Sequence, residues 1–95
     1  QLFNVQDLDE LPRPIRQVKM EPPNRFRQER ISGLVKLEIM IDEEGRTTVR
    51  KIIESSHPDL EQPAREALRQ WVWSPPKKNG EPVKARYVLP IGFRF

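Results

Sequence analysis

The clearest secondary-structure signal in the chain is the stretch 34–42, which reads Leu-Val-Lys-Leu-Glu-Ile-Met-Ile-Asp. Its apolar side chains recur at every second residue and place Val35, Leu37, Ile39 and Ile41 on one face. Successive side chains of a strand point to opposite faces, so this period predicts a half-buried β-strand. The elements on either side are best predicted outward from this strand.

The residues after this strand predict a hairpin and a return strand. Asp42-Glu43-Glu44-Gly45 is polar and ends in glycine, which readily adopts the positive φ of a tight turn. Residues 46–54 are rich in threonine, valine and isoleucine and predict the second strand. Because Ile52 and Ile53 are adjacent, we expect this strand to contain a bulge or to be buried on both faces.

A helix is predicted from Leu60 or Pro63 to Trp71. Its apolar residues follow helical spacing in one stripe, at Leu60, Ala64, Ala67, Leu68 and Trp71. Ser74-Pro75-Pro76 ends it, because proline lacks the N–H and clashes with the preceding turn. The following segment has Asn79-Gly80 at its centre, which is typical of a tight turn.

Residues 83–95 predict the last strand, with alternating odd positions in the core. These odd positions are Val83, Ala85, Tyr87, Leu89, Ile91, Phe93 and Phe95. A short helix is also predicted over residues 24–30, with Asn24 as its N-cap. The order helix, strand, strand, helix, strand predicts an α+β two-layer sandwich. It has a small three-stranded antiparallel sheet, with a short and a longer helix on one face.

The first part of the chain predicts an extended arm. Four prolines, at positions 12, 14, 22 and 23, oppose regular helix. We therefore expect residues 1–21 to be the end of a linker or arm, and residues 22–95 to be the domain. The pattern does not say whether the arm packs on the domain. The chain begins with Gln1 instead of methionine, so we expect it to be a piece of a longer protein.

Pro90 interrupts the last strand and indicates that this strand lies at an edge. Proline cannot donate to a sheet ladder, so it is confined to edges and bulges. If its missing donor points outward, the even residues Arg86, Val88 and Gly92 also offer their backbone groups to the free edge. Such an edge can accept a strand from another chain. Its charges and proline can equally serve only to prevent aggregation, and the pattern leaves both interpretations open.

Composition excludes several kinds of chemistry. The chain has 95 residues, a net charge of +3, one histidine and no cysteine. Disulfides and thiolate chemistry are therefore absent, and neither a metal nor a cofactor is expected. His57 follows two serines, but Asp59 is too close in sequence to orient it, so we expect no catalytic residue and no enzyme.

The basic C-terminal part of the chain is compatible with nucleic-acid binding. Residues 77–95 carry five basic residues and one acidic residue. Single-strand binders combine a positive groove with exposed aromatic rings, and Trp71 and Trp73 lie nearby in sequence. Trp71, however, continues the apolar stripe of the helix, so we expect it in the core and do not expect nucleic-acid binding.

Six segments, in order, carry a resemblance to a known family. They are Ile31–Leu37, Asp42–Arg46, Ile52–Ser56, the helix stripe followed by Trp71-Val72-Trp73-Ser74-Pro75, Asn79–Val83 and Leu89–Phe93. Together they resemble the C-terminal domain of TonB-type energy transducers, over about residues 21–95. Any one segment alone would be weak, and their joint order makes the resemblance specific. Where the family carries Tyr-Pro before the first helix, this chain has Pro22-Pro23 and therefore lacks that ring.

The resemblance implies a periplasmic domain of a protein anchored in the inner membrane of a Gram-negative bacterium. It implies capture of an extended segment, the TonB box, of a TonB-dependent outer-membrane transporter beside the last strand. It also implies coupling to inner-membrane, proton-driven motor proteins through an N-terminal part. The expected partner-binding residues are Lys84, Arg86, Tyr87, Val88, Gly92, Pro22, Pro23 and Asn24.

Other interpretations remain open from sequence alone. The domain can be a structural adaptor between two envelope proteins that transmits no force. A free edge can also exchange strands with a second copy, so a homodimer through residues 83–95 is possible. The sequence names neither the transported substrate nor the receptor.

Overall fold

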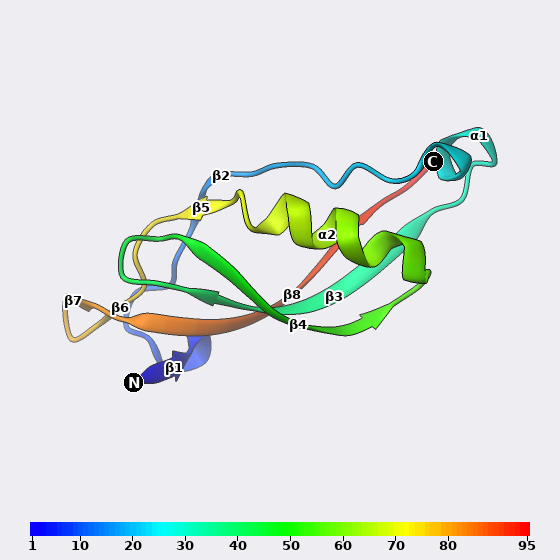
Figure 1. Ribbon diagram of the computed structural model, residues 1–95. Coiled ribbons are helices and arrows are strands. Elements are labelled where there is room, and N and C mark those ends of the chain that lie inside the picture. Colours follow the sequence, from blue (N-terminus) through cyan, green and yellow to red (C-terminus); the bar gives the residue numbers. More distant parts are fainter.

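A four-stranded sheet in the order β1-β8-β3-β4 forms one layer of the domain, and α2 lies over it (Figure 1). The computed structural model describes residues 1–95 and is elongated, with extents of 48 × 22 × 16 Å. Its elements are β1 (Leu2–Asn4), η1 (Val5–Asp7), β2 (Pro14–Arg16), α1 (Asn24–Gln28), β3 (Gly33–Ile41), β4 (Thr47–Ser55), η2 (Pro58–Leu60), α2 (Glu61–Leu68), β5 (Val72–Trp73), β6 (Lys77–Lys78), β7 (Glu81–Pro82) and β8 (Lys84–Phe93). Neither α-helix has the length and apolarity needed to cross a lipid bilayer.

The predicted α+β class is confirmed, and the arm adds a strand to the predicted sheet. β3, β4 and β8 are antiparallel neighbours, as expected. β1, from the arm, pairs with β8 in parallel and makes the sheet mixed. The local sequence does not predict this pairing, because it joins residues about 80 positions apart.

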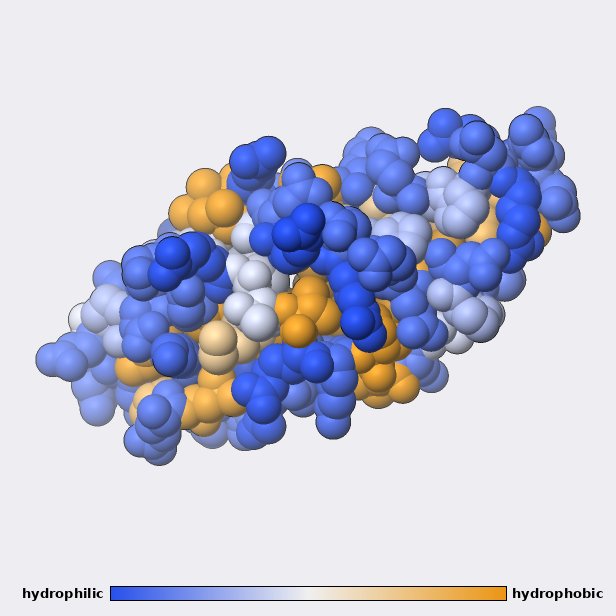
Figure 2. Space-filling view, in the orientation of Figure 1, coloured by the Kyte–Doolittle hydropathy of each residue, from blue (hydrophilic) through white to orange (hydrophobic).

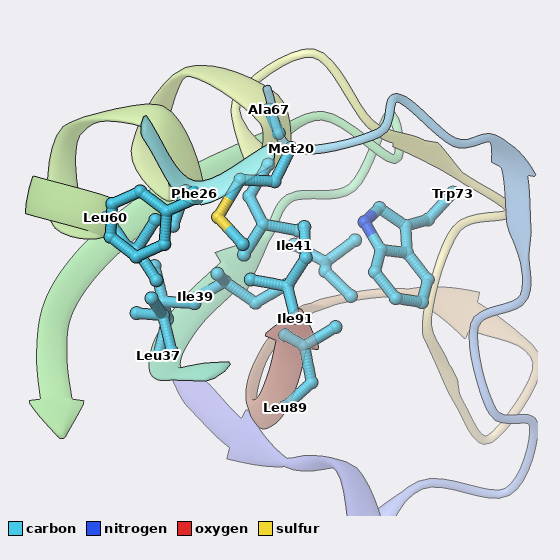
Figure 3. Packing of buried hydrophobic residues seen from close by; sticks show 13 residues of the cluster. Met20, Phe26, Leu37, Ile39, Ile41, Leu60, Ala67, Trp73, Leu89 and Ile91 are labelled. Carbon is cyan, nitrogen blue, oxygen red and sulfur yellow. The ribbon is translucent and has the colours of Figure 1, made fainter. Parts of the chain in front are cut away.

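The core lies between β3 and α2. Val35, Leu37, Ile39 and Ile41 are fully buried, as their period of two predicts. Leu60, Ala64, Ala67 and Leu68 meet them from the helix side. Figure 3 shows Met20 reaching from the arm into the same cluster. The arm is therefore part of the packed domain through at least this side chain.

The hairpin between β3 and β4 is held by Asp42. Its Oδ1 accepts hydrogen bonds from the amides of Glu44 and Arg46, each at 2.9 Å, and its Oδ2 accepts one from the Arg46 guanidinium at 3.0 Å. Partial burial acts to raise the pKa of Asp42, but these hydrogen bonds outweigh it and hold the pKa below its ordinary value. Gly45 has a φ of +84°, which confirms the predicted glycine turn.

β4 contains the irregularity that its adjacent isoleucines predict. Lys36 pairs with Glu54 while Leu37 pairs with Ile52, so Ile53 is an extra residue in β4. The register shifts again at Arg50. Each extra residue bends the strand and re-aims the side chains after it, which leaves Ile53 exposed while Ile52 packs against the core.

The long helix ends earlier than predicted. α2 stops at Leu68, not at Trp71. The chain leaves the helix because Val72 and Trp73 pair with β2, and the Trp73 amide donates to the Gly45 carbonyl at 2.8 Å. Trp71 still packs against the core, and its indole N–H donates to the Val18 carbonyl at 2.9 Å.

The predicted N-cap of the short helix is wrong. α1 begins with Asn24 as its first helical residue, and Pro23 occupies the cap position with extended backbone (ψ 151°). Pro23 fits there because its carbonyl accepts the hydrogen bond from the Phe26 amide, at 3.0 Å, while its missing N–H is not needed. Phe26 is fully buried and meets Phe93 of β8 edge-on, with ring centroids 5.8 Å apart.

Candidate strand-accepting edge

β8 is covered on its outer side only at its beginning. β1 pairs with Lys84, Ala85 and Arg86 alone. From Tyr87 to Phe93, β8 has β3 on one side and no strand on the other. The predicted edge at Pro90 is therefore present, and it starts after the third residue of the strand.

Backbone directions show which residues of β8 face that edge. The Leu34 amide donates to Ser56 Oγ, and its carbonyl accepts from the Ser56 amide, so the backbone groups of Leu34 point toward β4. Lateral direction alternates along a strand, so Val35 points toward β8, where its partner is Ile91. The odd residues of β8 therefore bond to β3, and the even residues face outward.

The open edge consequently presents Val88, Pro90 and Gly92. Pro90 lacks its donor on the outward side, where no ladder bond to β3 is lost. Gly92 lies so close to β3 that an added Cβ would stand 2.5 Å from the Gly33 carbonyl oxygen. Because the backbone groups of Val88 and Gly92 face outward and no strand covers them, both residues can form main-chain hydrogen bonds with an added strand.

Hollows lie at both ends of the open edge. One, of about 370 Å³, is lined by Asn4, Val5, Gln6, Glu38, Arg86, Tyr87 and Val88, where β1 leaves β8. The other, of about 360 Å³, lies between the arm and the end of β8 and is lined by Gln17, Val18, Lys19, Met20, Trp71, Ile91, Gly92 and Phe93. Side chains of an added strand would have room in both.

The charges around the edge are mainly basic. Lys84 and Arg94 are exposed, and Arg86 is half-buried. The Arg86 guanidinium donates from Nε to Asn4 Oδ1 at 3.0 Å. Glu38 is already paired with Arg50, at 3.2 Å. On the face drawn in Figure 2, hydrophobic residues form small patches between polar ones, so that face offers no broad apolar docking surface.

Comparison with known proteins shows the family of the chain. A family model described as Gram-negative bacterial TonB protein C-terminal matches residues 19–95. This chain belongs to that family. It is also 37% identical over 80 residues to a protein from Vibrio cholerae serotype O1 named "Protein TonB". That match covers 83% of this chain and 33% of the relative, so the chain spans about a third of the curated relative's length.

In this TonB-family domain the expected partner-binding residues fall into separate groups. Val88 and Gly92 lie together on the open edge, while Lys84 and Arg86 lie where β1 covers β8. Pro22, Pro23 and Asn24 precede or begin α1, near the opposite end of β8, because Phe26 contacts Phe93. The Tyr87 ring faces the helix side and packs on Trp73, with centroids 5.7 Å apart. A partner strand added along the whole of β8 would contact both Val88 with Gly92 and Lys84 with Arg86.

Sequence reasoning missed Asn4 and the arm residues Val18 and Met20. A short apolar run at Leu2-Phe3-Asn4-Val5 was a weak strand signal. Its parallel partner could not be found, because parallel pairing has no hairpin to mark it.

The serine and histidine in the loop after β4 form a structural pair. Ser56 Oγ lies 2.9 Å from His57 Nδ1, but it also accepts the hydrogen bond from the Leu34 amide. The carboxylate of Asp59 binds Arg25, at 2.8 Å, and so does not orient the imidazole. The His57 ring packs edge-on to Phe26, at 5.0 Å. No group of three or more histidine, aspartate and glutamate side chains is placed to hold a metal ion.

Proposed function

We propose that this domain captures an extended segment of a TonB-dependent outer-membrane transporter by strand addition to β8. The single observation that carries the proposal is the open edge from Val88 to Gly92, in a chain of the TonB C-terminal family. Main-chain hydrogen bonds supply affinity in such complexes, and side-chain pockets beside the edge supply selectivity. The hollow between arm residues 17–20 and the end of β8 fits that second role.

The domain then acts as a mechanical link and performs no chemistry of its own. In the proposed setting it lies in the periplasm, as part of a protein anchored in the inner membrane. Energy from the proton gradient reaches the transporter plug through the captured strand, by way of inner-membrane motor proteins. Lys84, Arg86 and Arg94 favour a segment with acidic neighbours, and such complementarity raises the association rate more than the affinity.

Photo-crosslinking in cells tests this proposal. A photo-reactive amino acid replaces Val88 in the full-length protein, expressed in its own organism. Val88 is 40% exposed on the open edge. We expect crosslinks to the N-terminal segment of an outer-membrane transporter, identified by mass spectrometry.

Position 53 provides a matched control. Ile53 is 44% exposed but lies on β4, at the opposite edge of the sheet, and it should give no transporter crosslink. Crosslinks from position 88 to other envelope proteins alone would favour the adaptor alternative. Crosslinks only to a second copy of the chain would favour a strand-exchanged dimer. Either pattern would contradict transporter capture.

A further inference from the structure

β1 occupies the same side of β8 on which a captured strand would lie. Its three residues pair in parallel with Lys84, Ala85 and Arg86. One side of a strand accepts only one neighbour, so a partner strand that extended along all of β8 would collide with β1. We propose that β1 is a removable self-ligand of this edge, which the partner segment displaces. This proposal rests on the proposed function.

The part of the β8 edge that β1 leaves open offers few backbone N–H donors. Between Val88 and Gly92 the outward positions are Val88, Pro90 and Gly92, and Pro90 has no N–H. The stretch under β1 adds Arg86 and Lys84, both of which are even positions with outward backbone groups. Displacing β1 therefore lengthens the main-chain ladder that a partner can form.

β1 is held by contacts that can be broken without disturbing the core. None of residues 1–11 is fully buried, and the hydrophobic cluster of the arm begins at Val18. Beyond the strand pairing, one side-chain hydrogen bond joins β1 to β8, from Arg86 Nε to Asn4 Oδ1, and the three side chains of β1 are only half-buried. Its release would leave the sheet of β3, β4 and β8 intact.

A clasp of exposed polar groups keeps the segment after β1 in place. Lys78 Nζ donates to the Asp7 carbonyl at 2.8 Å, and the Asp9 amide donates to the Lys77 carbonyl at 3.1 Å. The Asp9 carboxylate accepts a hydrogen bond from the Asn79 amide. Lys77 and Glu10 form a loose ion pair at 4.0 Å. Each of these surface contacts is weak on its own, about 1 kcal/mol for a hydrogen bond and less for an exposed ion pair, so releasing this segment costs less than opening the buried core.

β1 also indicates the chemistry of the segment that replaces it. An oxygen acceptor stands opposite Arg86, supplied here by the Asn4 side-chain amide, and Leu2 and Phe3 precede it. We therefore expect the partner segment to be extended and apolar, with asparagine, aspartate, glutamine or glutamate at the position facing Arg86.

A reversible covalent lock tests displacement. Leu2 and Lys84 are direct partners in the register, and neighbouring strands lie close enough for a disulfide. The chain has no cysteine of its own, so Leu2→Cys with Lys84→Cys gives a single bridge. The probes are synthetic peptides of the N-terminal plug segments of outer-membrane transporters, and binding is measured by calorimetry on the full 1–95 chain.

The oxidised lock should bind the peptide at least tenfold more weakly than the same protein after reduction. The reduced form controls for the two substitutions. Equal affinity in both forms would overturn displacement, because the partner would then add beside β1, at Val88–Gly92. If the native chain itself binds no peptide, the proposed function fails, and displacement fails with it. The two failures are thus distinguishable.

Loosening β1 should have the opposite effect. Asn4→Ala removes the contact to Arg86, and a larger open fraction raises the apparent affinity in proportion. We expect tighter binding by about twofold to fivefold. Gln1→Ala is the matched control, since Gln1 is exposed, precedes β1 and lines neither hollow. Unchanged or weaker binding by the Asn4 variant would contradict a self-ligand role.

Discussion

Val88→Pro is expected to abolish measurable binding of the transporter peptide while leaving the domain folded. The Val88 N–H points away from β3, so its loss removes no bond from the native ladder. It does remove one main-chain bond to the partner, at a cost of about 1 kcal/mol, and it leaves the partner's acceptor unsatisfied, at a further ~1–3 kcal/mol. The affinity should therefore fall by roughly 30-fold to 1,000-fold.

Val88→Ala separates the backbone effect from the side chain. Alanine keeps the N–H and removes most of a side chain that is already 40% exposed, so binding should change by only a fewfold. Calorimetric titration of both variants, with circular dichroism to verify folding, measures the difference. If the proline variant is folded and still binds like the native chain, strand addition at β8 is ruled out.

Gly45→Ala is expected to cause a large loss of stability. Gly45 has a φ of +84°, and a Cβ built there would lie 1.9 Å from the Trp73 carbonyl oxygen. That atom belongs to the backbone of β5, so it cannot rotate away. The hairpin would have to separate from β5 and break the hydrogen bond from the Trp73 amide to the Gly45 carbonyl. We expect the free energy of unfolding to fall by roughly 3 kcal/mol or more.

Gly80→Ala is the matched control for this prediction. Its φ is +80°, nearly the same, but no atom lies within 4 Å of an added Cβ. Only the cost of the left-handed backbone remains, about 1–2 kcal/mol. Chemical denaturation of both variants gives the difference directly. Equal losses would mean that the close approach of Gly45 to β5 does not support the fold.

The central part of the fold could be predicted because its signals are local. β3 has a strict period of two, and all four side chains on its core face are fully buried. The glycine hairpin and the bulged return strand also follow from adjacent residues. The end of α2 could not be predicted in this way, because Trp71 keeps the helical apolar spacing but is drawn out of the helix by tertiary contacts with the arm.

The open edge of β8 could also be predicted from a local signal, but the pairing of β1 with the start of that edge could not. Pro90 indicates by itself which side of β8 lacks a hydrogen-bonded neighbour. The parallel pairing of Asn4 with Arg86 depends on the path of the whole chain, which no residue pattern specifies. Lys84 and Arg86 are therefore paired with the chain's own strand β1, and of the partner-binding residues expected on the outward side of β8, Val88 and Gly92 remain on the open edge.

NMR titration of the isotope-labelled 1–95 chain with transporter plug peptides tests strand capture most directly. Capture predicts that shift changes concentrate on the amides of residues 83–95, with smaller changes around residues 22–30, where α1 meets the end of β8 through Phe26. Val88 and Gly92 should also gain protection from hydrogen exchange when the peptide is bound. Shifts confined to β4 and α2, or no shifts with any such peptide from a folded domain, would contradict capture at β8.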